Sequence, residues 1–325
     1  MVNRAIEAKT FSGYGGLWPS ELPKPQPAPD RVLVRVTAAG VTPLDHTILS
    51  GGHPRVSAPR VLGNEGAGVI EDAGGSGLAV GSRVMFTGPY GVAENGTWQE
   101  WLLVKPEHLA LVPDAIDDVV AASLPVAYLT AQITLTQAGF KPGMTVLAPG
   151  IGGSVGNATY QFARAQGSAK VISTAGSAAK AARASELGFE DVIDLSTEAL
   201  ADGVRRITAG KGVDIVIESI GGTVTSEALS SVANGGVLTT LGYSAGRKTT
   251  IDVTDLIWKR ARMAGFSLFA QSAETIAAAW QDMLPLIASG SVKPIVERAY
   301  PLAEAGEALR HLIEDRPFGK VILTI

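Results

Sequence analysis

The stretch APGIGGSVG, Ala148–Gly156, decides the fold class of this chain. It joins an apolar run, TVLAPG, to a segment in which Val155, Thr159 and Phe162 fall at helical spacing, with Gly167 placed to end the helix. A glycine-rich turn between a strand and a helix presents backbone N–H groups and the positive end of the helix dipole to a phosphate. The stretch therefore predicts the phosphate-binding turn of a dinucleotide site.

The surroundings of this turn strengthen the prediction. Ile151 stands where a strict G-x-G-x-x-G pattern has its first glycine, so an isolated structural turn is the alternative for the stretch alone. No Gly-Lys-Ser/Thr follows, which excludes a P-loop. Five further strand-like runs alternate with alanine-rich helical stretches, which predicts a parallel sheet covered on both faces. These runs are KVISTAG, DVIDL, VDIVIES, GVLTTLG and ARMAGFSLF.

The tip of the strand KVISTAG predicts which nicotinamide cofactor binds. An acidic residue about 20 positions after the last glycine accepts the ribose hydroxyls of NAD, and Ala175 stands there in this chain. Ser177 and Lys180 follow instead, and they suit a 2′-phosphate, which an acidic residue would repel. The structural alternative is that Ser177 caps the next helix and Lys180 is solvated on its surface. We expect NADPH rather than NADH.

The chain is expected to hold two domains of an α/β protein. Residues 1–124 contain short alternating or β-branched segments cut by glycine and proline, which predicts an antiparallel barrel or sandwich. Residues 125–270 carry the parallel-sheet pattern. After Gln271 a helix, a strand, a short helix and the final strand VILTI are expected, and we assign residues 271–325 to the completion of the first domain.

Composition narrows the possible functions. The chain has 325 residues, 46% of them hydrophobic, a net charge of −4 and no cysteine. The charge disfavours nucleic-acid binding, and no run reaches the roughly 20 apolar residues that span a bilayer. The N-terminal residues lack the apolar core of a signal peptide, so we expect a cytoplasmic protein without membrane partners. The absence of cysteine excludes disulfides, thiolate catalysis and cysteine-ligated zinc.

Nearly the whole chain resembles the medium-chain dehydrogenase/reductase superfamily, most closely its zinc-free quinone oxidoreductase and enoyl reductase branch. The resemblance implies a GroES-like first domain, a Rossmann second domain, and a cleft between them for nicotinamide and substrate. It also implies a homodimer that pairs the last Rossmann strand, ARMAGFSLF, across a twofold axis; an apolar edge strand independently favours such a partner. The motifs that carry the resemblance are AAGVTPLDHTILSGGHP, VLGNEGAGVIEDAG, GTWQEWLLV, LPVAYLTAQITL, APGIGGSVG, STAGSAAK, VDIVIESIGG, VLTTLGY and GKVILTI.

The resemblance also excludes a catalytic metal. Zinc alcohol dehydrogenases of the superfamily read Gly-His-Glu where this chain reads LGNEG, and they bind zinc through that His and a Cys of a GVC motif. Asn64 and Thr42 occupy these places here, and neither is a good zinc ligand. The four histidines show no ligand spacing. We therefore expect a zinc-independent protein in which Glu65 is a buried brace and Asn64 either lines the substrate cleft or only satisfies backbone groups.

Without a Lewis acid, an ordinary alcohol is a poor substrate, whereas a quinone or an α,β-unsaturated carbonyl compound accepts hydride readily. Donors must then stabilise the charge that builds on oxygen. His53, in GGHP, stands where related enoyl reductases carry a Tyr, and the alternative is that it lies in an exposed loop. Thr42, His53 and Asn64 are the candidate catalytic residues, while Asp45 is expected to fasten its loop.

The cofactor residues follow from the turn and from the resemblance. Thr130 matches a threonine near the nicotinamide carboxamide, although a helix threonine can instead bond back to a carbonyl. Ser219, Gly242 and Tyr243 end the fourth and fifth strands, at the crevice that receives ligand, where Tyr243 is a cofactor wall or a half-buried aromatic. The full candidate set is Thr130, Gly150, Gly153, Ser154, Val155, Ser177, Lys180, Ser219, Gly242 and Tyr243.

The leading hypothesis is an NADPH-dependent, zinc-independent reductase of quinones or α,β-unsaturated carbonyl compounds. An enoyl-thioester reductase is one alternative, and it would need a basic patch for a carrier phosphate. The other is a nucleotide-binding member of the family without turnover, since the altered Thr42 and His53 positions leave catalysis open. The sequence does not identify the acceptor.

Overall fold

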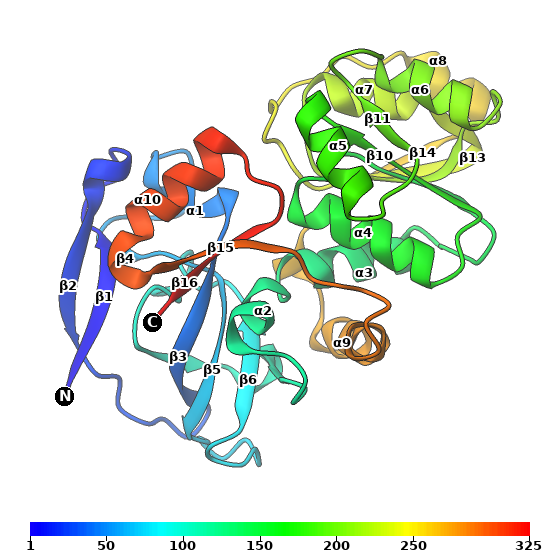
Figure 1. The fold of residues 1–325 in the computed structure, drawn as a ribbon. Coiled ribbons are helices and arrows are strands. Elements are labelled where there is room, and N and C mark those ends of the chain that lie inside the picture. Colours follow the sequence, from blue (N-terminus) through cyan, green and yellow to red (C-terminus); the bar gives the residue numbers. More distant parts are fainter. The chain divides into compact units, whose positions relative to one another are not determined.

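The computed structural model describes all 325 residues, and they divide into two compact units. The first unit comprises Met1–Val126 and Pro294–Ile325, and the second comprises Ala127–Lys293 (Figure 1). Helix α9 (Ala273–Ala288) belongs to the second unit because it packs on α3 (Ala127–Gln137). The chain thus returns to the first unit at Pro294 and not at the expected residue 271. None of the helices is long and apolar enough to cross a membrane.

The second unit is built on a parallel sheet of six strands in the order β11-β10-β9-β12-β13-β14. This is the doubly wound order in which the strand sequence reverses between the first and fourth strands, so a ligand crevice forms at their carboxyl ends. All six predicted strands are present. They are β9 (Thr145–Ala148), β10 (Lys170–Ala175), β11 (Val192–Asp194), β12 (Val213–Glu218), β13 (Val232–Thr240) and β14 (Arg262–Gly265).

Helices cover this sheet through apolar side chains. Leu200 and Val204 of one helix and Leu229 of another join a buried cluster with the strand residues beneath them. On α3 and α4, Tyr128 and Phe162 meet edge to face at 5.8 Å. The remaining helices of the unit are α4 (Ser154–Ala165), α5 (Ala178–Glu186), α6 (Leu200–Ile207), α7 (Thr223–Ser230) and α8 (Val253–Lys259).

The first unit contains two sheets. The larger has the order β15-β16-β3-β5-β6-β8, with β7 also paired to β3, and it is antiparallel except for the β15–β16 pair. Its strands are β3 (Val32–Val41), β5 (Glu65–Asp72), β6 (Arg83–Thr87), β7 (Trp101–Val104), β8 (Leu109–Leu111), β15 (Val296–Pro301) and β16 (Lys320–Thr324). The smaller sheet is β2-β1-β4, from β1 (Val2–Ala8), β2 (Leu17–Pro23) and β4 (Arg60–Val61). The predicted return of the C-terminal strand is confirmed by the pairing of β16 with β3.

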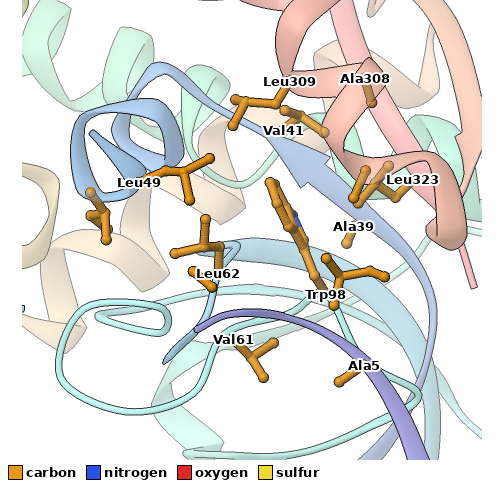
Figure 2. Packing of buried hydrophobic residues seen from close by; sticks show 14 of the residues in the cluster. Ala5, Ala39, Val41, Leu49, Val61, Leu62, Trp98, Ala308, Leu309 and Leu323 are labelled. Carbon is orange, nitrogen blue, oxygen red and sulfur yellow. The ribbon is translucent and has the colours of Figure 1, made fainter. Parts of the chain in front are cut away.

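Three short helices complete this unit: α1 (Pro43–Leu49), α2 (Asp118–Ser123) and α10 (Ala305–Arg310). Between α1, α10 and the sheets lies a core in which Trp98 is fully buried (Figure 2). Figure 2 shows Leu62 and Leu49 on one side of the indole and Leu323 on the other. The Trp98 indole N–H donates to the Gly40 carbonyl at 3.2 Å, so its one polar atom is satisfied.

A buried ion pair connects the two segments of the chain that form the first unit. The Glu65 carboxylate at the start of β5 pairs with the Lys320 ammonium at the start of β16, and both side chains are buried. The second carboxylate oxygen accepts the Val126 backbone N–H at 2.7 Å. Burial raises the pKa of Glu65, and the Lys320 charge opposes that rise. Gly40 must be glycine because a Cβ there would collide with the Glu65 side chain.

We predict that Lys320→Met destabilises the protein by about 3 to 5 kcal/mol, since it leaves the Glu65 charge buried without a partner. Urea unfolding measures the loss. The control, Arg205→Gln, breaks the exposed pair with Asp202 and should cost no more than about 1 kcal/mol. Glu65→Gln added to Lys320→Met should recover part of the loss. Equal, small effects of the two single substitutions would contradict a buried, mutually dependent pair.

Candidate cofactor and substrate sites

The glycine turn of the second unit has the geometry of a phosphate-binding turn. Gly150 has a φ of 81°, which favours glycine, and Gly153 is the N-cap of α4. A Cβ on Gly156 would collide with the Gly150 carbonyl, so the first turn of α4 packs directly on the loop. Ser154 and Val155 form that first turn and are half-buried. Their backbone N–H groups lie among the helix-start donors that have no intrahelical acceptor.

Thr174 of β10 fixes this turn, although the sequence interpretation did not single it out. Its hydroxyl accepts the Gly150 N–H at 3.0 Å, and its carbonyl accepts the Ile151 N–H at 2.9 Å. The turn is therefore tied to the neighbouring strand before any ligand binds. The sequence signal for such a position is a hydroxyl residue near the end of a buried strand, and Ser173 shares it with Thr174.

The tip of β10 carries no acidic side chain. Ala175 ends the strand in a buried position, and Ser177 is the N-cap of α5, accepting the Lys180 backbone N–H at 3.4 Å. The capping alternative for Ser177 is thus present in the structure. It does not compete with anion binding, because the start of a capped helix still directs N–H groups outward. The Lys180 side chain is half-buried on the first turn of the same helix.

Hydrogen bonds to the Glu218 carboxylate fix the carboxyl ends of β12 and β13. Glu218 is a second residue that the sequence interpretation did not identify. One of its carboxylate oxygens accepts the backbone N–H groups of Ile220 and Gly221, at 2.5 and 2.7 Å. The other accepts the hydroxyls of Thr225 and Thr240, at 2.8 and 3.1 Å. Ser219 therefore follows a fully buried carboxylate whose hydrogen bonds fix the turn.

The turn after β13 packs on the turn after β12. A Cβ on Gly242 would collide with the Ser219 carbonyl, which accounts for glycine at this predicted position. Tyr243 is 46% exposed, more than a half-buried core aromatic, and the Arg247 guanidinium lies 5.3 Å from its ring centre. The Ala245 N–H donates to the Ile220 carbonyl at 2.8 Å, so the two turns are fastened together.

Thr130 lies in the middle of α3 and is buried. A hydroxyl bond back to a helix carbonyl was the alternative role for Thr130. Thr134 makes such a bond, and its hydroxyl donates to the Thr130 carbonyl at 2.7 Å. All ten predicted cofactor residues lie in the second unit.

Thr42 and Asp45 form a closed polar group in the first unit. One Asp45 carboxylate oxygen accepts both the backbone N–H and the hydroxyl of Thr42, each at 2.8 Å. The other accepts the Gly63 N–H at 2.8 Å. Complete burial raises the pKa of Asp45 to about 6, although these three donors oppose the rise. Asp45 fastens its loop as expected, and it holds the Thr42 hydroxyl.

Asn64 follows the fastened Gly63 and precedes the ion-paired Glu65. Its backbone carbonyl accepts the Thr87 hydroxyl at 2.8 Å. Its side chain is 3% exposed, and the amide oxygen is buried without a hydrogen-bond partner. The side chain therefore satisfies no backbone group, which was one of the two roles considered for it.

His53 lies in the loop between α1 and β4 and is half-buried. Its Nδ1 accepts the Arg55 backbone N–H at 3.3 Å. Because Nδ1 accepts this bond, the neutral ring carries its proton on Nε2. The Nε2–H group is then a donor that the bond to Arg55 does not use. The loop location considered for His53 is thus compatible with a donor role.

These residues do not fit zinc. Thr42 donates its hydroxyl to Asp45, Asn64 offers only an amide, and the chain has no cysteine. No group of three or more His, Asp or Glu side chains is arranged to hold a metal ion. A hollow of about 510 Å³ in the first unit contains none of the predicted site residues, and its charged pair, Arg4 and Glu100, is already satisfied.

Two protein-family models match parts of this chain. The family model described as "Alcohol dehydrogenase GroES-like domain" matches residues 28–114. The model described as "Zinc-binding dehydrogenase" matches residues 154–289. The chain is 32% identical to the quinone oxidoreductase of Pseudomonas aeruginosa, over 96% of this chain and 98% of that protein.

Two further similarities extend the comparison. A synaptic vesicle membrane protein VAT-1 homolog from Danio rerio is 31% identical, over 98% of this chain and 69% of that protein. The solved structure of Escherichia coli quinone oxidoreductase complexed with NADPH superposes with a TM-score of 0.89 at 28% identity, covering 99% of this chain and 100% of that one.

We predict that Asp45 gives the folding stability a specific pH dependence. Because its folded pKa of about 6 lies above the ordinary value of 3.8, its stabilising contribution is complete below about pH 4 and is lost as the pH rises through 6. Asp45→Asn should remove this slope, so the wild type should lose roughly 2 to 3 kcal/mol more than the variant across that window. Urea midpoints at several pH values measure it. Parallel profiles for the two proteins would refute the assignment, and Asp202→Asn, at an exposed site, is the control.

Proposed function

Since the chain belongs to the medium-chain dehydrogenase/reductase superfamily, together with quinone oxidoreductases, we propose that it is an NADPH-dependent, zinc-independent reductase of quinones or α,β-unsaturated carbonyl compounds. The observation that carries the proposal is the structure at the carboxyl ends of two neighbouring strands of the second unit, β9 and β10. A glycine turn fixed for a pyrophosphate lies beside a strand end that has Ala175, Ser177 and Lys180 but no acidic side chain. A cytoplasmic location is part of the proposal.

In this proposal the residues of the second unit bind and orient the cofactor. The N–H groups of Ser154 and Val155 receive the pyrophosphate, and Ser177 with Lys180 receives the 2′-phosphate. Thr130, Ser219 and Tyr243 lie toward the nicotinamide end. Bound NADPH supplies hydride.

The residues of the first unit act on the acceptor. His53 offers its Nε2–H to the oxygen on which negative charge builds. Thr42 is held by Asp45, so it shapes the site rather than donating its proton. A conjugated acceptor needs only such hydrogen-bond donors, whereas an alcohol substrate needs a metal to lower its hydroxyl pKa.

The direct test is oxidation of NADPH by the purified protein over a panel of quinones, enones and enoyl thioesters. The proposal expects turnover with quinones or small enones. NADPH binding without turnover of any acceptor would favour a nucleotide-binding protein, the alternative left open by the changed Thr42 and His53 positions.

One observation favours the enoyl-thioester alternative. Arg247 and Lys248 are exposed on the turn after β13, at the carboxyl edge of the sheet, and they provide the basic pair that a carrier phosphate requires. Higher kcat/KM for an enoyl thioester than for its short phosphate-free analogue, lost in Arg247→Ala with Lys248→Ala, would decide for this alternative.

We also propose a homodimer formed through β14. This strand pairs only with β13, and all four of its residues are exposed. The preceding helix α8 exposes Val253, Ile257 and Trp258, the last of them 77% exposed. An open strand edge beside exposed apolar side chains is stabilised by a partner strand.

Lys180→Ala is predicted to weaken NADPH binding about 10-fold or more while changing NADH binding less than about 2-fold, because only NADPH carries the 2′-phosphate. Fluorescence titration of each cofactor measures both values. Lys211→Ala, at an exposed turn of the same unit, should change neither. Equal losses for the two cofactors would remove the phosphate assignment.

Met263→Lys, in the middle of β14, is predicted to convert the dimer to a monomer, because two copies would bring like charges together at the strand edge. Size-exclusion chromatography with light scattering should give twice the 33.6 kDa chain mass for the wild type and one chain mass for the variant. Val80→Lys, at an exposed position of the first unit, should remain dimeric. A monomeric wild type, or a dimeric variant, would contradict this interface.

A further inference from the structure

The backbone on both sides of Asn64 is fixed by other residues. Gly63 donates its N–H to Asp45, and Glu65 is held by Lys320 and the Val126 N–H. The Asn64 carbonyl accepts the Thr87 hydroxyl. Every one of these bonds uses backbone atoms of position 64 or atoms of its neighbours, so none of them depends on the Asn64 side chain.

The Asn64 side chain contributes nothing to this arrangement. Asn64 is 3% exposed, and its Oδ1 atom is buried without a hydrogen-bond partner. A buried polar group without a partner costs free energy, and an apolar side chain of similar volume would avoid that cost. Native proteins keep few such groups, and a functional role is one of the explanations for those that remain.

We propose that Asn64 is a substrate-binding residue whose amide binds the reacting oxygen of a quinone and, after reduction, the hydroxyl of the hydroquinone. This inference rests on the proposed reductase function and narrows its acceptor class. The Nδ2–H group donates to the quinone carbonyl. The Oδ1 atom accepts from the hydroquinone hydroxyl.

An amide suits this pair of ligands because it offers a donor and an acceptor on adjacent atoms. Reduction of a quinone adds one hydride from NADPH and one proton from solvent, and it converts a carbonyl, which only accepts, into a hydroxyl, which also donates. Reduction of an enone at its β-carbon leaves a carbonyl in the product, which gives Oδ1 no donor. The unpartnered acceptor of Asn64 therefore favours quinones over enones. Asn64 itself transfers no proton.

The test compares Asn64→Leu, which removes both the donor and the acceptor, with Asn64→Asp, which keeps only acceptors when ionised. The probes are p-benzoquinone, p-hydroquinone and NADPH. Asn64→Leu should raise the KM for p-benzoquinone about 10-fold or more and weaken p-hydroquinone binding, measured by calorimetry, to a similar degree. Its thermal midpoint should equal or exceed that of the wild type, and its NADPH affinity should be unchanged.

Asn64→Asp should weaken p-benzoquinone binding while retaining p-hydroquinone binding within about 3-fold, since its oxygens still accept a hydroxyl. Thr159→Val is the matched control, because it removes another buried, unpartnered polar atom, in the second unit. It should leave both quinone ligands unaffected.

The outcomes separate this inference from the proposed function. A wild type that reduces p-benzoquinone, with an Asn64→Leu variant of equal KM and equal hydroquinone binding, overturns the role of Asn64 and leaves the reductase function standing. A lowered thermal midpoint in both variants with unchanged ligand binding assigns Asn64 to folding and also overturns it. If the wild type shows no turnover but binds p-hydroquinone, and Asn64→Leu loses that binding, the role of Asn64 is supported and the reductase function is rejected.

Discussion

The carboxylate of Glu65 is fully buried, and the Lys320 ammonium is the cation that pairs with it. Their pairing joins the start of β5 to the start of β16, and so fastens the returning C-terminal segment to the unit that the N-terminal residues begin. It also fixes the position of Asn64, the residue before Glu65. An ion pair removed from water is costly unless both partners are present, so the first unit depends on one residue from each of the two segments of the chain that form it.

The second unit fixes its ligand edge by the same physical means. Thr174 holds the glycine turn after β9, and the Glu218 carboxylate holds the turn after β12 through two backbone N–H groups. Both are buried polar side chains whose hydrogen bonds are satisfied within the protein. The amide oxygen of Asn64 is also buried, but it has no hydrogen-bond partner. The satisfied carboxylate and hydroxyl groups fix the turns of the second unit.

Much of the fold could be predicted from local pattern. The six strands of the second unit, the α4 helix and the returning C-terminal strand follow from apolar periodicity and glycine placement, which are properties of neighbouring residues. The membership of α9 could not be predicted, because it depends on packing against α3. The partners of Glu65, Glu218 and Asp45 are also fixed by tertiary contacts. The sequence identified Asn64 as a changed metal position, but only burial and the missing hydrogen bond distinguish its two possible roles.

In the proposed function, hydride reaches a conjugated acceptor without a metal, because the Thr42 hydroxyl donates to Asp45 and the Asn64 amide is a poor zinc ligand. The most direct measurement is the rate of NADPH oxidation with p-benzoquinone before and after exhaustive chelation, with zinc content determined on the same sample. We expect the same rate in both, at a zinc content far below one ion per chain. A rate that falls on chelation and returns with added zinc would contradict it.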